Sequence, residues 1–139
     1  MSAGVIIKID SASDADGWAS ALGAFGISEI YELPGLGSSR RSSIKIENLD
    51  QVGHYRVADL VIVQPQDGDF VQGFNSLARF EHPEEAIYIF GGTMTRLTQA
   101  DLGNQTPESI YIPTSEDLFP AQAGAIVFWD RFWKRGGRA

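Results

Sequence analysis

The sequence contains no cysteine, so it has no disulfide bonds and no thiolate metal ligands. Its two histidines, His54 and His82, are far apart and lack the HxxxH spacing of a metal site. We therefore expect no bound metal. His54 is expected at the surface or in packing, and His82, directly before a proline, in a turn. The composition favours a cytoplasmic protein.

Long apolar runs are also missing. The N-terminal run at residues 5–9 is interrupted by Lys8 and followed by acidic residues, whereas a signal peptide has a longer apolar run after basic residues. No stretch approaches the roughly 18 apolar residues of a membrane span. We expect neither a signal peptide nor a contact with a membrane.

Familiar nucleotide-binding and hydrolase motifs are absent. No GxxxxGK[ST] or GxGxxG pattern occurs, because Gly35-Leu36-Gly37 lacks a third glycine. No serine lies in a nucleophile elbow. A phosphate-binding loop, a dinucleotide fingerprint and an α/β-hydrolase site are thus not indicated.

Basic residues are outnumbered, and the net charge of −7 disfavours nucleic-acid binding by the chain as a whole. The basic residues gather at 40–45 and 131–138. Two interpretations stay open, namely solvated surface charges or local RNA contacts through arginine–phosphate pairs. If RNA is bound, the predicted contacts are Arg40, Arg41 and Arg135.

The patterns that are present predict one α/β domain over residues 1–139. Short apolar segments alternate with helical ones, which favours a mostly parallel sheet with helices on both faces. Strands are predicted at 5–9, 28–33, 58–63, 86–90 and 109–112, and helices at 16–25, 70–78, 98–102 and 121–133.

Two of these strands end in distinctive turns, at Gly91-Gly92 and at Pro113. Ligands of parallel sheets bind beyond the carboxyl ends of the strands, and glycine lets a backbone approach a ligand closely. We expect the two turns to lie side by side and to form a binding site.

Several polar and aromatic residues have two interpretations. Asp14 and Asp16 are either catalytic carboxylates or helix caps, and capping is favoured. Asp117 either holds a substrate amine or is a solvated acid. The aromatic residues Phe128, Trp129, Phe132 and Trp133 are predicted to share one helix face, which packs on the sheet or on a second subunit rather than stacking on bases.

Residues 86–131 resemble the carboxyl-terminal half of SPOUT-class RNA methyltransferases of the SpoU (TrmH-like) branch. The resemblance rests on FGGTMTRL (90–97), IPT (112–114) and AQAGAIVFWDR (121–131). It implies a SPOUT-type α/β knot with a C-terminal trefoil knot, a homodimer, and S-adenosylmethionine bound in the knot by backbone groups. The matching cofactor positions are Gly91, Ile112 and Leu118.

The sequence departs from that family at its catalytic positions. Ser20 stands where the family has arginine, and a serine cannot supply a fixed positive charge. Arg40, Arg41 and Arg96 are the candidate catalytic replacements, and Arg96, in the same turn as Thr93, is favoured. The other departures are Asp14 and Asp16 for Asn and Gly, Thr93 and Thr95 for Glu and Gly, and Asp117 and Phe119 for Ser and Asn.

Three functions remain open on these grounds. The first is S-adenosylmethionine-dependent methylation of a ribose 2′-hydroxyl in RNA. The second is a knotted homodimer that has lost the transfer chemistry and acts as a binding or structural protein. The third, which applies if the motif match is chance, is a doubly wound α/β domain with a different ligand.

Overall fold

The computed structural model describes residues 2–37, 42–70 and 74–136, which form one seven-stranded sheet in the order β3-β2-β1-β6-β4-β7-β5. Every described strand pair is parallel, which confirms the predicted sheet. The strands are β1 (Ser2–Ile7), β2 (Glu29–Glu32), β3 (Ile44–Lys45), β4 (Asp59–Val63), β5 (Asn75–Ser76), β6 (Glu85–Phe90) and β7 (Glu108–Tyr111).

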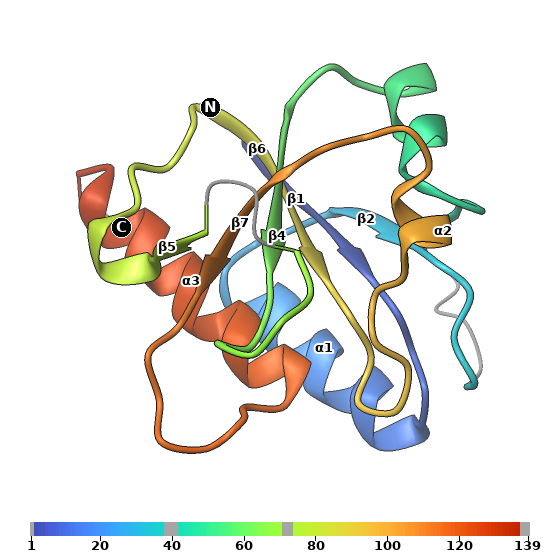
Figure 1. Cartoon of the computed structure of the whole chain (residues 1–139), viewed down its shortest axis with the longest axis horizontal. Coiled ribbons are helices and arrows are strands. Elements are labelled where there is room, and N and C mark those ends of the chain that lie inside the picture. The colour runs from blue at the N-terminus through green and yellow to red at the C-terminus, as the bar shows by residue number, and fades with distance from the viewer. Residues whose placement is uncertain (1, 38–41, 71–73, 137–139) are drawn as a thin grey trace.

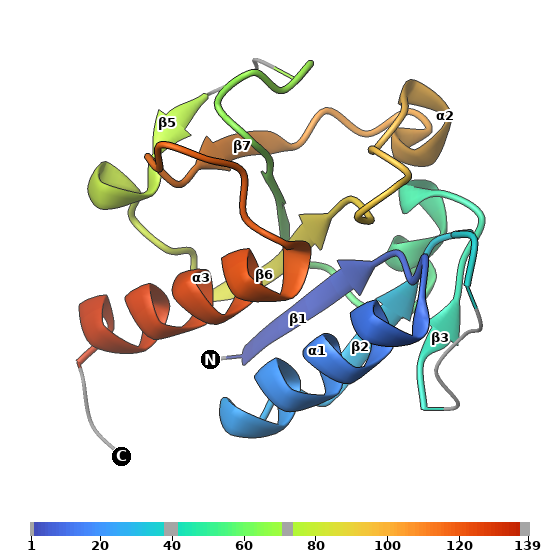
Figure 2. The same ribbon diagram turned by 90° about the horizontal axis from the view of Figure 1, so that it is seen from below.

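The described helices cover both faces of this sheet, as predicted. Helices α1 (Ala12–Ala24) and α3 (Pro120–Lys134) pack side by side on one face (Figures 1 and 2). On the other face, α2 (Gln99–Leu102) contacts the 3₁₀ helix η1 (Leu49–His54). A second 3₁₀ helix, η2 (Leu77–Arg79), precedes β6.

The central strands are buried on both sides, and their successive side chains enter two separate cores. In β1, Val5 and Ile7 pack under α1 and α3, whereas Ile6 points to the face of α2 and η1 and joins Leu49 and Leu102. This alternation explains why the strands read as continuous apolar runs.

Helix α1 begins four residues earlier than predicted because Ser11 is its N-cap. The Ser11 hydroxyl accepts a hydrogen bond from the Asp14 N–H at 3.2 Å. The interpretation of Asp14 as the cap is therefore wrong, and its carboxylate is used elsewhere. Gly26 follows the helix with a φ of 65°, a conformation that favours glycine and ends the helix.

The helix predicted at 121–133 is confirmed as α3, with Pro120 in the first turn and Gly136 after its end. A Cβ on Gly124 would lie 2.6 Å from the Trp18 ring, so glycine permits the close approach of α1 and α3. With 15 residues, α3 is the longest described helix, and no described helix is long and apolar enough to cross a membrane.

The predicted aromatic face of α3 is split by the structure. Phe128 is buried, but Trp129 and Trp133 are 56% and 66% exposed. Residues spaced i, i+1, i+4 and i+5 span too wide an arc for all of them to reach the sheet. Packing of all four rings on the sheet is therefore wrong, because Trp129 and Trp133 face solvent. Packing on a second subunit, the other arrangement predicted for this face, stays a prediction.

Other differences concern short elements without a clear periodicity. The helix predicted at 70–78 is instead β5 followed by η2, with residues 71–73 outside the described ranges. Strand β3 and helix η1 were not expected. Helix η1 begins after Asn48, whose side chain accepts a hydrogen bond from the Asp50 N–H at 2.9 Å.

Candidate functional site

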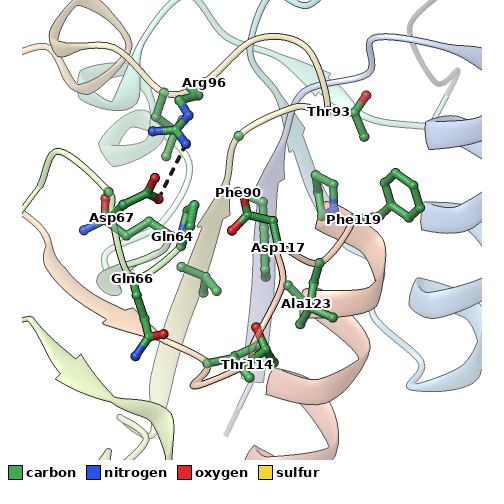
Figure 3. Close-up of a pocket in the computed structure, with 18 of the residues that line it drawn as sticks. Gln64, Gln66, Asp67, Phe90, Thr93, Arg96, Thr114, Asp117, Phe119 and Ala123 are labelled. Carbon is green, nitrogen blue, oxygen red and sulfur yellow. Dashed lines mark ion pairs between the residues drawn. The ribbon is translucent and has the colours of Figure 1, made fainter.

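A cavity of about 510 Å³ lies at the carboxyl ends of three strands (Figure 3). Three loops meet there, namely residues 64–70 after β4, 91–97 after β6 and 112–119 after β7. The first residues of α3 complete the wall. This is the position at which parallel sheets bind ligands, and the volume suits a nucleoside-sized molecule.

The structure brings four predicted site residues together in this cavity. Gly91, Arg96, Ile112 and Leu118 all line it. The turns at 91 and 113 are not direct neighbours, however, because β4 lies between β6 and β7 in the sheet. The prediction that they lie side by side is therefore corrected: the end of β4 separates them and supplies part of the wall, including Gln64.

The 91–97 loop is held by two buried carboxylates from the start of α1. Asp10 accepts hydrogen bonds from the backbone N–H groups of Met94 and Thr95, both at 2.8 Å. Asp14 accepts one from the Thr93 hydroxyl at 2.8 Å. Burial would raise the pKa of Asp10, but the hydrogen bonds from Leu36, Met94 and Thr95 outweigh it and hold the pKa below its ordinary value.

A buried ion pair fixes the far end of the same loop. The Lys8 ammonium lies 2.7 Å from the Asp101 carboxylate and also donates to the Arg96 carbonyl oxygen at 3.2 Å. Asp101 belongs to the capping box of α2, in which Thr98 is the N-cap. The backbone of the 91–97 loop is thereby tied to β1, α1 and α2.

The 64–70 loop faces the 91–97 loop across the cavity. The Gln64 side chain braces it, accepting a hydrogen bond from the Phe70 N–H at 3.2 Å and donating to the Phe70 carbonyl. One ion pair, between Arg96 Nη2 and Asp67 Oδ1 at 3.6 Å, joins the two loops (Figure 3). Both side chains are largely exposed, so this pair contributes little stability and can open for a ligand.

The cavity is lined by more acidic than basic side chains. Asp67, Asp69, Glu116 and Asp117 line it, against the single arginine Arg96. The Asp117 carboxylate points towards the middle of the cavity in Figure 3. Since Asp67 faces Arg96, the remaining charge is negative, which favours a cationic ligand.

The positions that depart from the family lie in different surroundings. Thr93 and Phe119 line the cavity, whereas Asp16 and Ser20 are exposed on α1 and are not among its lining residues. Thr95 faces Asp10 instead. Among the residues that the structure describes, Arg96 supplies the only cationic side chain of the cavity wall.

Of the residues predicted to contact RNA, the structure describes only Arg135, which does not line the cavity. Arg40 and Arg41 lie outside the described residues. Arg135 is at the end of α3, towards the amino ends of the strands, where its Nη1 donates to the His82 carbonyl at 3.1 Å. Nearby, Arg131 donates to the carbonyls of Pro83 and Glu84.

His82 belongs to a buried cluster that the sequence did not reveal. Its Nδ1 lies 2.7 Å from the Tyr88 hydroxyl and its Nε2 lies 2.7 Å from Asp130 Oδ2. Burial lowers the pKa of His82, although Asp130 opposes the shift. The prediction of a turn residue is wrong, because His82 is buried and does not lie in a turn. The sequence could not reveal its partner Asp130, which is 48 positions away. Within the described ranges, no three acidic or histidine side chains form a metal-binding group.

Comparisons of the sequence with protein-family models and with curated proteins give no match. The structure, in contrast, resembles several solved structures over almost its full length, although identity is low throughout. The similarity to these structures is therefore one of fold.

Three of these structures illustrate the similarity. TrmJ from Z. mobilis ZM4 gives a TM-score of 0.75 at 12% identity, covering 100% of this chain and 72% of TrmJ. A structure determined to explain the 2-OH methylation of C/U34 on tRNA gives 0.73 at 15% identity, covering 98% of both chains. The SpoU methyltransferase AviRb from Streptomyces viridochromogenes, in complex with AdoMet, gives 0.71 at 11% identity, covering 99% of this chain and 62% of AviRb.

The chain therefore has the SpoU-type α/β fold of these RNA methyltransferase structures, as the resemblance of residues 86–131 predicted. It spans about three fifths of the AviRb chain but almost all of the tRNA-related structure.

Proposed function

We propose that this protein binds S-adenosylmethionine in the cavity and is an RNA methyltransferase of SpoU type, acting on a ribose 2′-hydroxyl. One observation carries the proposal: Gly91, Ile112 and Leu118, selected as cofactor positions from sequence, line one cavity at the carboxyl ends of the strands. The AdoMet-bound AviRb structure, which shares the fold, supports the same choice of ligand.

The cavity fits this cofactor in size and chemistry. Its volume of about 510 Å³ is in the range of small-molecule sites, and apolar side chains such as Phe90, Leu97 and Ile112 form flat walls. The glycines at 91 and 92 leave backbone groups accessible, and Asp117 places a negative charge beside a cationic ligand. When bound, S-adenosylmethionine supplies a methyl group on a positively charged sulfur.

In this proposal Arg96 has the role that the family gives to its missing arginine. Its guanidinium lies at the cavity wall and keeps a positive charge at every relevant pH. Released from Asp67, it can neutralise a phosphate of the acceptor or an oxygen on which negative charge develops. Arg40, Arg41 and Arg135 are proposed as further phosphate contacts.

A second candidate is a homodimer of the same fold that binds a ligand without methyl transfer. The observation that favours it is the replacement of the family's catalytic side chains by Ser20, Thr93 and Phe119. Ser20 is exposed and away from the cavity lining, so it cannot act there. The two candidates share the ligand and differ in the reaction.

The proposal includes a homodimer, a C-terminal trefoil knot and a cytoplasmic location, where RNA acceptors are present. Exposed Ile126, Trp129 and Trp133 on α3 support self-association through this helix. The knot is proposed for the segment after β6, because the resemblance implies it and the 64–70, 91–97 and 112–119 loops meet in one cavity.

The proposal is tested with wild-type protein and an Arg96→Ala variant. Calorimetry measures S-adenosylmethionine binding, and transfer of a radiolabelled methyl group to total tRNA and rRNA measures activity. We expect micromolar binding by both proteins and at least about a hundredfold less transfer by the variant, typical for the loss of one charge-stabilising group. Arg79→Ala, an exposed arginine in η2 and outside the cavity lining, is the matched control.

Three results would change the conclusion. Wild-type protein that does not bind S-adenosylmethionine contradicts the proposed ligand. Binding without transfer to any RNA favours the second candidate. Equal transfer by wild type and Arg96→Ala removes Arg96 from the mechanism. RNA contacts through Arg40, Arg41 and Arg135 also require an affinity that falls steeply with salt.

A further inference from the structure

Asp10 lies behind the cavity wall and does not line the cavity itself. It follows β1 closely and is only 7% exposed. Its carboxylate nevertheless accepts hydrogen bonds from two different loops. A buried carboxylate needs such donors, because a buried charge without hydrogen-bond partners is strongly unfavourable.

The first of these loops is the 91–97 loop of the cavity. Asp10 Oδ2 accepts from the N–H groups of Met94 and Thr95, both at 2.8 Å, and Oδ1 accepts from the Thr95 hydroxyl at 2.8 Å. A Cβ on Gly92 would lie 2.1 Å from Oδ2, so the backbone runs directly against the carboxylate. The position of this cavity wall is therefore set by Asp10.

The second loop follows β2 and precedes Arg40 and Arg41 in the chain. The Leu36 N–H donates to Asp10 Oδ1 at 3.0 Å, and the Gly37 N–H donates to the Ile9 carbonyl at 2.7 Å. The Asp10 carboxylate thus accepts hydrogen bonds from both loops. A shift of either loop changes the hydrogen bonds available to the other.

We propose that Asp10 is a positioning residue for the ligand of the cavity. It acts through the 91–97 loop and couples the order of that loop to the order of residues 34–37. The inference rests on the proposed function for the identity of the ligand. Holding the loop in its binding geometry before the ligand arrives removes an ordering cost from binding.

The test replaces the Asp10 carboxylate by an amide, Asp10→Asn. Its NH₂ group would face N–H donors in place of an acceptor oxygen. Asp50→Asn is the matched control, because Asp50 also accepts loop hydrogen bonds, from the Asn104 N–H at 3.1 Å and Gln105 Nε2 at 2.8 Å, but lies outside the cavity lining. S-adenosylmethionine affinity is measured by calorimetry, and loop opening by amide hydrogen exchange.

We expect Asp10→Asn to weaken binding about 10- to 100-fold, the usual effect of removing a partner that orients a binding group. Exchange should accelerate at Leu36, Met94 and Thr95 and stay slow in β6. Asp50→Asn should accelerate exchange only near residues 103–105 and leave the affinity within about twofold. Thr95→Val, which removes one donor, provides a milder variant with a smaller loss if Asp10→Asn does not fold.

Unchanged affinity in Asp10→Asn would overturn the inference, as would faster exchange spread evenly through the core, which indicates a purely structural role. If wild-type protein does not bind S-adenosylmethionine, the proposed function fails separately. Amide hydrogen exchange then still tests whether the 91–97 loop and residues 34–37 are coupled. Faster exchange at both Leu36 and Met94 in Asp10→Asn supports the coupling, and faster exchange at only one of them overturns it.

Discussion

Asp117 is one of the exposed acidic side chains that give the cavity its negative charge. It is exposed on the 112–119 loop and points into the cavity, and no described residue forms an ion pair with it (Figure 3). S-adenosylmethionine carries a positive sulfonium, whereas its product, the thioether, does not. For the proposed ligand, a carboxylate at this place therefore favours S-adenosylmethionine over the uncharged product.

We expect Asp117→Asn to weaken S-adenosylmethionine binding about fivefold, equivalent to about 1 kcal/mol for a solvent-exposed charge pair. Affinity for S-adenosylhomocysteine should be nearly unchanged, since that ligand lacks the sulfonium charge. Calorimetry with both ligands measures the ratio. Asp59→Asn, an exposed acid at the start of β4, is the control and should alter neither affinity. Equal weakening of both ligands would contradict a charge effect.

At the scale of elements, α3 is fastened to the segment before β6 by a buried polar cluster. His82 contacts Tyr88 and Asp130, and Lys134 lies 2.9 Å from Asp130. Arg131 and Arg135 donate to backbone carbonyls of the same segment. Because α3 also begins at the cavity, this cluster helps to define where the cavity wall lies.

The cluster makes stability depend on pH. The pKa of His82 lies below its ordinary value of 6.5 in the folded protein, mainly through burial, so the unfolded chain binds the proton more readily. The contribution of His82 to stability is therefore fully present above about pH 6.5. It falls as the pH drops from there to the folded pKa, by at most about 1.4 kcal/mol per pH unit. The titratable and charged groups around His82 are Tyr88, Asp130, Arg131, Lys134 and Arg135; of these, Asp130 opposes the lowering of the His82 pKa, and Lys134 and Arg131 add to it.

Denaturant unfolding between pH 7.5 and 5 measures this slope in wild type and in His82→Gln. The variant should be less stable at pH 7.5 but show a flatter dependence, since the titrating ring is gone. His54→Gln, at an exposed histidine, should keep the wild-type slope. Parallel curves for wild type and His82→Gln would show that other groups cause the dependence.

Elements with strong local signals were predictable from sequence, and long-range partners were not. Helix α3 has Pro120 at its start and Gly136 after its end, and β6 is a continuous apolar run, so both were located within one or two residues. The site at the ends of two strands was predicted because strand ends carry ligands in parallel sheets, whereas Gly91, Ile112 and Leu118 were selected from the resemblance to the SpoU branch. Asp10, His82 and the place of β4 between β6 and β7 depend on contacts between distant segments, which periodicity does not encode.

For the whole molecule, the exposed aromatic residues of α3 predict association of two copies. Trp129 stacks on Phe132 at 5.5 Å and on Trp133 at 6.3 Å between ring centroids, which forms a rigid apolar surface. Burying such rings in an interface is favourable, at about 25 cal/mol per Å². We expect Trp129→Ser/Trp133→Ser to raise the dimer dissociation constant at least about tenfold, measured by analytical ultracentrifugation.

A double variant at two other exposed apolar positions, Tyr55→Ser/Val57→Ser, is the control for surface changes of this kind. It should leave the association state unchanged. Wild-type protein that sediments as a monomer at micromolar concentration, or a control that dissociates like the tryptophan variant, would contradict an interface on α3.

The sheet ends at both sides in strands of two residues, β3 and β5. Such short borders present few unpaired N–H and C=O groups in a row, so another chain finds little backbone to extend the sheet. A protein built in this way resists the strand-to-strand stacking that leads to fibrils. In the proposed dimer, contacts between copies are therefore expected to come from side chains such as those of α3, where a single surface substitution can tune them.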